Sequence, residues 1–262
     1  MRGVILAGGL GTRLSPLTQI TNKHLLPVYD RPMIYYPIEN MVNAGIDEVL
    51  IVTGGSHAGH FLNLLRNGKS LRVRRLSYAY QEGEGGIADA LKLAQDFVED
   101  QRFCVMLGDN LYGNHIGPYA RRFEQDLSIN ALVLAQELSS QYDPSRFGLA
   151  VKKPEDSLKI EFKPRSVVEK PTPASLKTWA DKGIQAAIVT GTYFYTPEVF
   201  SVCSQLLPSA RGELEITDVN NHYTRQNSLL AMVIKGWWSD AGTFESLYYA
   251  AQNVFGLGVN LD

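Results

Sequence analysis

The first half of the chain alternates between short continuous apolar runs and stretches in which apolar residues recur with helical spacing. Apolar runs predict buried strands at Arg2–Leu6, Glu48–Thr53 and Phe103–Leu107, and an alternating pattern predicts another strand at Val73–Gln81. Helical segments are predicted between them at Met33–Ala44, through Phe61–Leu65, and at Ile87–Val98. Strands and helices that alternate in this way favour an α/β fold, with a parallel sheet covered by helices on both faces.

The second half follows a less regular pattern. Strands are predicted at Ala131–Ala135, Gly148–Val151, Leu158–Phe162, Ser166–Val168, Ala187–Tyr195 and Leu229–Ile234. Helices are predicted at Pro197–Leu206, Ile216–Arg225 and Phe244–Phe255, with a turn over Trp237–Thr243. The proline-rich stretch Lys163–Pro173 is interpreted as a loop, and no repeat or linker interrupts the chain. We therefore expect residues 1–262 to form a single domain.

Composition narrows the functional classes. A net charge of −2 provides no overall basic field for nucleic acid or anionic lipid, so any bound anion needs a local site. No stretch reaches the ~20 apolar residues of a membrane span. Of the two cysteines, Cys104 lies within a predicted strand, which makes a disulfide framework improbable. We expect a reducing, cytoplasmic setting, with neither nucleic acid nor membrane as a partner.

The first apolar run leads directly into a glycine-rich turn, Gly8-Gly9-Leu10-Gly11-Thr12-Arg13. Glycines allow backbone N–H groups to approach an anion closely, and Arg13 adds a full positive charge, so the segment predicts a phosphate site. A simple strand-to-helix turn is the alternative. Leu14 stands where a dinucleotide fingerprint has its third glycine, which disfavours a dehydrogenase, and no Walker A lysine follows.

Three further charged residues are candidates for phosphate chemistry. Lys23 precedes Leu25-Leu26-Pro27 and is interpreted as a cation for a reacting phosphoryl group, or else as a surface lysine. Asp109 directly follows a predicted strand, where ligands bind in parallel α/β sheets, and Asp240 lies in the turn before the last helix. Both aspartates are candidate Mg²⁺ ligands, with an Asx turn or a helix N-cap as the alternative for each.

Other polar groups are less specific. Gln81 ends a predicted strand, where its amide could read a base edge through a paired donor and acceptor. In the simplest interpretation, Lys170 pairs with Glu169 or faces solvent, and Ser209–Asp218 is typical of a helix start with an acidic first turn. His57 and His60 are three residues apart without an evident third ligand, so we interpret them as surface helix residues.

Together these motifs resemble the sugar nucleotidyltransferases, most closely the glucose-1-phosphate thymidylyltransferase family. The matching segments are Gly8–Leu14, Lys23, Leu25–Val28, Pro32–Pro37, Leu107–Asn110, Glu169–Pro171, Ser209–Asp218 and Trp238–Thr243. The resemblance implies Mg²⁺-dependent transfer of a nucleotidyl group from dTTP to glucose 1-phosphate, giving dTDP-glucose and pyrophosphate. It also implies a Rossmann-like, mostly parallel central sheet of the GT-A-like type and a homo-oligomer such as a tetramer.

The resemblance assigns the nucleotide to a half of about residues 1–112 and the sugar phosphate to about residues 113–262. It implies a nucleotide site made by Leu6, Gly8, Gly9, Gly11, Thr12, Arg13, Gln81, Gly86 and Asp109. The implied sugar-phosphate site is Gly148, Glu169, Lys170, Thr190, Gly191, Tyr193 and Arg211. Catalysis is assigned to Arg13, Lys23 and Asp109, and the metal to Asp109 and Asp240.

The chain departs from the family pattern in three places. Phe147 replaces a tyrosine that often precedes the glycine at position 148, and Glu82 and Glu84 add acids near the expected base site. These changes leave UTP, or an amino-sugar 1-phosphate, open as alternative substrates, and a non-catalytic sugar-nucleotide-binding homologue open as an alternative function. The sequence also stops soon after the helix that begins at Phe244, which implies a short form without the helical extension of longer relatives.

Overall fold

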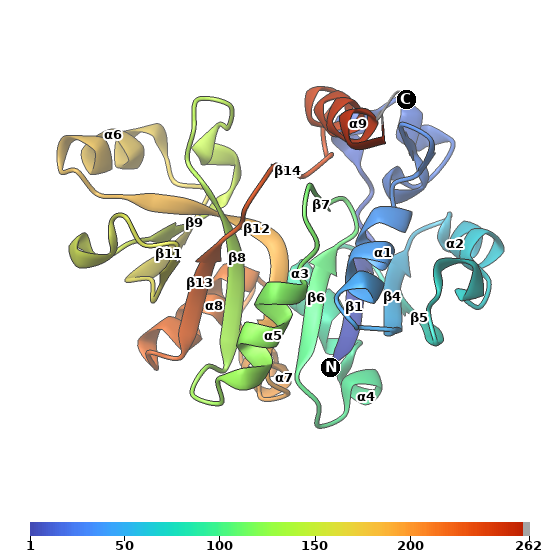
Figure 1. Cartoon of the computed structure of the whole chain (residues 1–262), viewed down its shortest axis with the longest axis horizontal. Helices are drawn as coiled ribbons and strands as arrows, with labels where there is room; N and C mark the ends of the chain where they lie inside the picture. The colour runs from blue at the N-terminus through green and yellow to red at the C-terminus, as the bar shows by residue number, and fades with distance from the viewer. Residues whose placement is uncertain (259–262) are drawn as a thin grey trace.

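A ten-stranded mixed sheet forms the centre of the computed structural model, which describes residues 1–258 (Figure 1). β9 and β11 branch from β12, outside the main path of the sheet. From edge to edge, that path runs β10 (Glu161–Phe162), β13 (Leu229–Val233), β8 (Ala131–Glu137), β12 (Ala186–Tyr195), β6 (Phe103–Leu107), β1 (Arg2–Ala7), β4 (Glu48–Gly54) and β5 (Arg75–Gln81). The branching strands are β9 (Gly148–Val151) and β11 (Ser166–Glu169).

Strand direction confirms the predicted mostly parallel sheet. β5, β4, β1 and β6 pair in parallel, so that Val4 lies between Leu50 and Val105. β12 runs antiparallel to both β6 and β8, while β13 pairs in parallel with β8. A single reversed strand thus joins the β1–β6 group to the β8–β13 group.

Helices cover both faces of the sheet, as the alternation of elements predicts. Val4 and Leu6 of β1 pack into one buried cluster with α3, α4, α7 and α8, whereas Ile5 and Ala7 pack into another with α1, α2 and α5. This separation follows from the two-residue period of a strand. The bounds are α1 Tyr35–Asn43, α2 Ala58–Leu65, α3 Ile87–Lys92, α4 Gln95–Val98, α5 Gly117–Gln125, α6 Pro173–Asp181, α7 Val199–Ser204, α8 Ile216–Arg225 and α9 Phe244–Gly258.

Several predicted boundaries are wrong, for local reasons. The helix expected at Ile87–Val98 is two helices, because tight i→i+3 bonds at Leu93 and Ala94 interrupt the α-helical ladder. The strand expected at Leu158–Phe162 is confined to its last two residues, and Leu158 is 95% exposed. Helices α5 and α6 were not predicted. The apolar residues of α6 have weak helical spacing, and none of its residues is fully buried.

The last helix returns to the first half of the chain. α9 packs on the small ribbon formed by β2 (Pro27–Val28) and β3 (Arg31–Pro32), through a third buried cluster that includes Val28, Met33 and Ala250 (Figure 1). The strand before it, β14 (Trp238–Ser239), pairs with β7 (Leu111–Tyr112), directly after β6. This return places the loop that carries Asp240 beside the end of β6.

Both cysteines are buried and free, and Cys104 lies in β6 as predicted. Over residues 1–258, no helix has the length and apolarity required to cross a bilayer.

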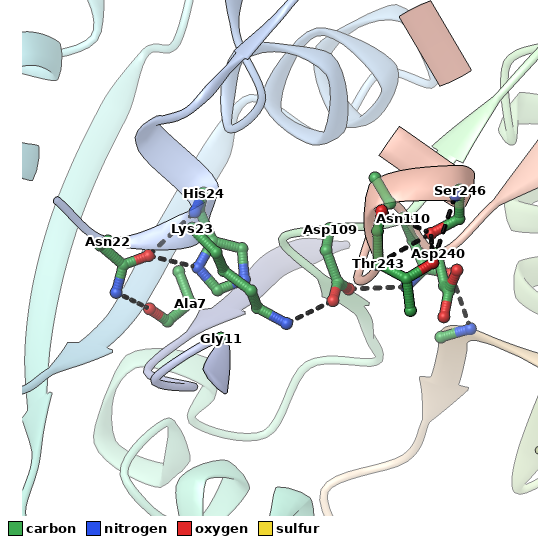
Figure 2. Close-up of polar contacts among 12 residues, drawn as sticks. Ala7, Gly11, Asn22, Lys23, His24, Asp109, Asn110, Asp240, Thr243 and Ser246 are labelled. Atoms are coloured by element: carbon green, nitrogen blue, oxygen red, sulfur yellow. Dashed lines mark hydrogen bonds and ion pairs between the residues drawn. The ribbon is translucent and has the colours of Figure 1, made fainter. Parts of the chain in front are cut away.

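A buried histidine fastens the Lys23 segment to the end of β1 (Figure 2). Asn22 donates from Nδ2 to the carbonyl of Ala7 at 3.4 Å, and its Oδ1 accepts from the backbone N–H of His24 at 2.9 Å. His24 Nδ1 lies 2.7 Å from the same Oδ1, so Nδ1 carries the ring proton. Burial, followed by the neighbouring Lys23 charge, lowers the pKa of His24 to about 3.

This histidine makes stability depend on pH. Its pKa rises from about 3 in the folded protein to 6.5 on unfolding, so between these values the unfolded chain binds the extra proton. The free energy of unfolding therefore falls as pH falls from 6.5 towards 3, by up to ~1.4 kcal/mol per pH unit from this group. We expect His24→Asn to reduce the slope by about that amount, measured by urea unfolding between pH 4 and 6.

Phe61→Leu is the matched control, because Phe61 packs beside His24 with ring centroids 6.5 Å apart but does not titrate. It should lower stability while retaining the parent slope. Equal slopes in the parent and His24→Asn would show that the histidine is protonated in the folded state.

Candidate active site

The candidate site lies at the carboxyl ends of β1 and β6, where the order of the parallel strands reverses. β1 connects onward to β4 on one side and pairs with β6 on the other. Ligands of open α/β sheets bind at such a switch point, because the loops from the two strands diverge there and leave a crevice. Gly8 begins the loop after β1, and Asp109 follows β6 after a single glycine.

A cavity of about 730 Å³ opens at this point, between the two halves of the chain. Most of the predicted site residues line it. They are Leu6, Gly8, Gly9, Thr12, Arg13, Lys23, Gln81, Gly86, Asp109, Gly148, Glu169, Lys170, Gly191, Tyr193, Arg211 and Asp240. Residues that are distant in sequence, from the first and second halves alike, thus share one space.

Two predicted site residues, Gly11 and Thr190, do not line this cavity. Gly11 has φ +67°, and a Cβ there would lie 2.8 Å from Cβ of Lys23, so it provides room for the lysine stem. Thr190 is fully buried; its hydroxyl donates to the carbonyl of Leu134 at 3.0 Å and accepts from Tyr112 at 2.9 Å. It therefore supports β12 beneath the cavity.

An ion pair between Lys23 and Asp109 lies at the cavity wall (Figure 2). Asp109 is 7% exposed, and Asn110 donates from Nδ2 to its other oxygen at 3.0 Å. Burial works to raise the pKa of Asp109, but the charge and hydrogen bond of Lys23 outweigh it and hold the pKa below its usual value. Asp109 is therefore a carboxylate at neutral pH.

Asn110 connects the end of β6 to two other strands. Its Oδ1 accepts from the backbone N–H of Gly191 on β12 at 3.0 Å and from Nε1 of Trp238 on β14 at 2.6 Å. A Cβ at Gly191 would lie 2.8 Å from Cγ of Asn110 and 2.8 Å from Cδ1 of Leu107. Glycine at 191 is thus required for the close approach of β12 to Asn110.

Asp240 faces the cavity from the loop between β14 and α9. Its alternative interpretation, an N-cap of α9, is wrong, because Thr243 performs that role: Thr243 Oγ1 accepts from the backbone N–H of Ser246 at 3.2 Å (Figure 2). The Asp240 carboxylate instead lies 3.6 Å from a guanidinium nitrogen of Arg146. Arg13 reaches the same loop, since a Cβ at Gly242 would lie 3.2 Å from its guanidinium.

The opposite wall holds a charged cluster. Glu169 accepts from the hydroxyl of Thr217 at 2.7 Å, and its other oxygen lies 3.5 Å from Arg211 and 3.6 Å from Lys170. Arg211 also pairs with Glu215 at 2.7 Å. Both cations at this wall are thus paired with carboxylates, which orient them beside the cavity.

Backbone bonds join the two halves near the predicted base site. Leu214 donates to the carbonyl of Gly85 at 2.8 Å and accepts from the N–H of Ala88 at 3.3 Å. Gly86 lies between them with φ +91°, and a Cβ there would be 2.7 Å from the carbonyl oxygen of Leu214. Only glycine permits this contact at the start of α3.

The structure adds lining residues that sequence reasoning did not assign. They include His24, Glu84, Asn110, Arg146, Phe147, Glu213, Glu215, Thr217, Asn220 and Trp238. Some of them lie inside motifs that the sequence analysis identified. Asn110, for example, directly follows Asp109, so its position next to a predicted site residue could have indicated it. Arg146 carried no signal, because only folding brings its short 3₁₀ turn, Pro144–Arg146, opposite Asp240.

Comparison with known proteins shows which family has this sequence and this fold. The sequence model of the family described as nucleotidyl transferase matches residues 2–255. A glucose-1-phosphate thymidylyltransferase of Neisseria meningitidis is 39% identical over 261 residues, which span 97% of this chain and 82% of that protein. One from Mycobacterium tuberculosis is 40% identical over 258 residues, with the same two coverages.

Solved structures share the architecture. A structure named for a glucose-1-phosphate thymidylyltransferase from Bacillus anthracis, in complex with sucrose, superposes with a TM-score of 0.84 at 40% identity, covering 100% of this chain and 97% of that one. A UDP-glucose pyrophosphorylase complexed with UDP-glucose shares the fold, with a TM-score of 0.80 at 24% identity and 98% coverage of each chain. The chain therefore belongs to the nucleotidyl transferase family and is an enzyme homologous to the glucose-1-phosphate thymidylyltransferases.

Proposed function

We propose that the protein transfers a thymidylyl group from dTTP to glucose 1-phosphate, giving dTDP-glucose and pyrophosphate. The observation that carries this proposal is the ion pair of Lys23 with Asp109 in a cavity lined by both halves of the chain. An ammonium and an ionised carboxylate at this position suit a phosphate-bearing substrate and a divalent cation. The names of the relatives described above support the choice of substrates.

Electrostatics explains why such a site needs its cations. Two phosphate charges ~4 Å apart repel by about 4 kcal/mol at an effective dielectric constant of ~20, so two polyanions need counter-charge to meet. Arg13, Lys23, Lys170 and Arg211 line the cavity and supply it. A sugar-phosphate oxygen then attacks the α-phosphorus in line, the α–β P–O bond breaks, and pyrophosphate leaves. The attacking oxygen is already ionised at neutral pH, so positioning and charge stabilisation suffice without a general base.

The two aspartates fit a Mg²⁺ ion that binds together with the nucleotide. Over residues 1–258, no group of three or more His, Cys, Asp or Glu side chains forms a protein-only metal cage. Mg²⁺ commonly takes one or two carboxylates and completes its coordination with substrate phosphates and water. We infer that Asp109 and Asp240 would hold it, and that it would supply charge neutralisation to the phosphates.

We assign the nucleotide to the wall formed by Gly8, Gly9, Thr12, Arg13, Gln81 and Gly86, and the sugar phosphate to the wall formed by Gly148, Glu169, Lys170 and Arg211. The first wall follows the parallel strands, whose carboxyl ends bind nucleotides in open α/β sheets. The second offers the Glu169 carboxylate, with the hydroxyls of Tyr193 and Thr217 in the same cavity, for sugar hydroxyls, and it offers Lys170 and Arg211 for a phosphate.

The assembly and its setting are also proposals. Tyr29, Phe244, Tyr248 and Phe255 expose aromatic surface around α9, which is consistent with a homo-oligomer. Two buried free thiols suit a reducing, cytoplasmic setting.

Lys23→Ala and Asp109→Asn should each lower kcat/KM by about 10²–10³-fold, because each removes charge stabilisation at the reacting phosphates. The measurement is pyrophosphate release from dTTP and glucose 1-phosphate, with urea unfolding to verify the fold. Lys177→Ala, on the exposed side of α6, is the matched control and should retain the parent rate. Rates within threefold of the parent in both site variants would contradict the assignment.

Asp240→Asn should raise the Mg²⁺ concentration needed for half-maximal activity by about tenfold, because one of the two proposed carboxylate ligands is lost. Asp181→Asn at the exposed end of α6 removes the same charge away from the cavity and should leave the Mg²⁺ titration unchanged. A normal titration for Asp240→Asn would assign that carboxylate to pairing with Arg146 alone.

Substrate choice is tested by pyrophosphate release over a matrix of dTTP, UTP and CTP against glucose 1-phosphate and glucosamine 1-phosphate. We expect dTTP with glucose 1-phosphate to have the highest kcat/KM. A preference for UTP or for the amino sugar would select those alternatives. Nucleotide binding with no pyrophosphate release in any combination would indicate a non-catalytic homologue.

A further inference from the structure

Gln81 presents a fixed polarity to the cavity. It ends β5, is 8% exposed and lines the cavity wall. Its amide nitrogen Nε2 donates to Oδ2 of Asp89 at 3.3 Å and to the carbonyl of Gly86 at 3.4 Å. Both partners only accept, so rotating the amide would place Oε1 against two oxygens and break both bonds. The expectation that Gln81 offers a paired donor and acceptor is therefore wrong: its donor is occupied within the protein.

Asp89 is itself held in place. Lys92, one turn later on α3, lies 2.9 Å from its Oδ1, which leaves Oδ2 for Gln81. The hydrogen bond from Lys92 lowers the pKa of Asp89 below its usual value, so the side chain accepts and does not donate at neutral pH. A Cβ at Gly85 would overlap the carboxylate, so glycine at 85 provides the space that it occupies.

The acceptor oxygen of Gln81 points the other way, towards the glycine-rich loop. A Cβ at Gly8 would lie 2.9 Å from Oε1, so the absence of a side chain at Gly8 leaves this oxygen uncovered. Over residues 1–258, no hydrogen-bond donor reaches Oε1, whereas Nε2 has two acceptors. At this point the cavity therefore offers a carbonyl oxygen that lacks a donor.

We propose that Asp89, oriented by Lys92, is a positioning residue that makes Gln81 a pure acceptor and so selects nucleotides whose base presents an N–H group there. The inference rests on the proposed function and specifies how the base is chosen. Thymine and uracil carry a proton on N3, whereas N3 of cytosine has a lone pair. A cytosine in the same position would place two acceptors face to face, with no hydrogen bond to offset the desolvation of either.

This contact separates keto-pyrimidines from cytosine, and it does not separate dTTP from UTP, because both bases carry the same N3–H. Any discrimination between those two nucleotides must arise elsewhere, at the thymine methyl group or the ribose 2′ position.

Asp89→Asn tests the proposal, because asparagine can donate as well as accept and so permits the Gln81 amide to rotate. The measurement is the ratio of kcat/KM for dTTP to that for CTP with glucose 1-phosphate, accompanied by calorimetric affinities for both nucleotides. We expect the ratio to fall by at least about tenfold. The change should arise mainly in KM and in affinity, with kcat for dTTP within a few-fold of the parent.

Asp96→Asn is the matched control: it makes the same change at an exposed position of α4, away from Gln81, and should keep the parent ratio. Asp89→Ala provides a second test should Asp89→Asn fail to fold; it removes an acceptor without adding a donor and should lower the ratio by less. An unchanged ratio in the folded Asp89 variants, or equal parent affinities for dTTP and CTP, overturns the proposal. Discrimination in binding without any turnover would overturn the proposed function and leave this inference standing.

Discussion

The site depends on keeping a lysine and a carboxylate together at the edge of the core without neutralising either. Burial alone would favour the protonated form of Asp109, and Lys23 reverses that preference. Lys23 can hold its place beside Asp109 because its segment is bonded to the end of β1 through Asn22, which also contacts the neutral ring of His24. Removing one partner from such a pair leaves an uncompensated buried charge. The ion pair therefore depends on Asn22 and His24, which hold the lysine segment in place.

The two halves of the chain meet through contacts that only small residues allow. Gly86 lets the start of α3 approach Leu214, and Gly191 lets β12 approach Asn110. Asn110 then bonds Gly191 and Trp238 with one oxygen, which aligns β12, β14 and the end of β6. These contacts join the two halves of the chain at the wall of the cavity. Glycines in this protein thus serve close packing at several places besides the glycine-rich loop after β1.

Charge in the cavity is arranged as compensated sets. Asp240 faces Arg146, and Arg211 is shared among Glu169 and Glu215. These side chains are partly exposed, so the carboxylates serve mainly to orient the cations that a phosphate would meet. The same logic extends to the uncharged Gln81, whose orientation follows from the ionised Asp89 behind it. Under the proposed function, both the base and the phosphates would thus be met by groups that carboxylates hold in position.

The order of strands and helices in the first half and the glycine-rich loop after β1 could be predicted from the sequence, because they depend on local periodicity and on residues directly after a strand. Asp109 directly after β6 was predictable for the same reason, and both Asp109 and Lys23 line the cavity. The side chains that contact the site residues could not be predicted from the sequence. Arg146 opposite Asp240, Asn110 bonded to Gly191, and Asp89 behind Gln81 depend on how the strands and loops pack in space. Likewise Thr190 and Gly191 are neighbours in sequence, yet one supports β12 beneath the cavity and the other lines it. Periodicity records which positions are buried; which side chains then meet is decided by register and crossover, and these exist only in the folded chain.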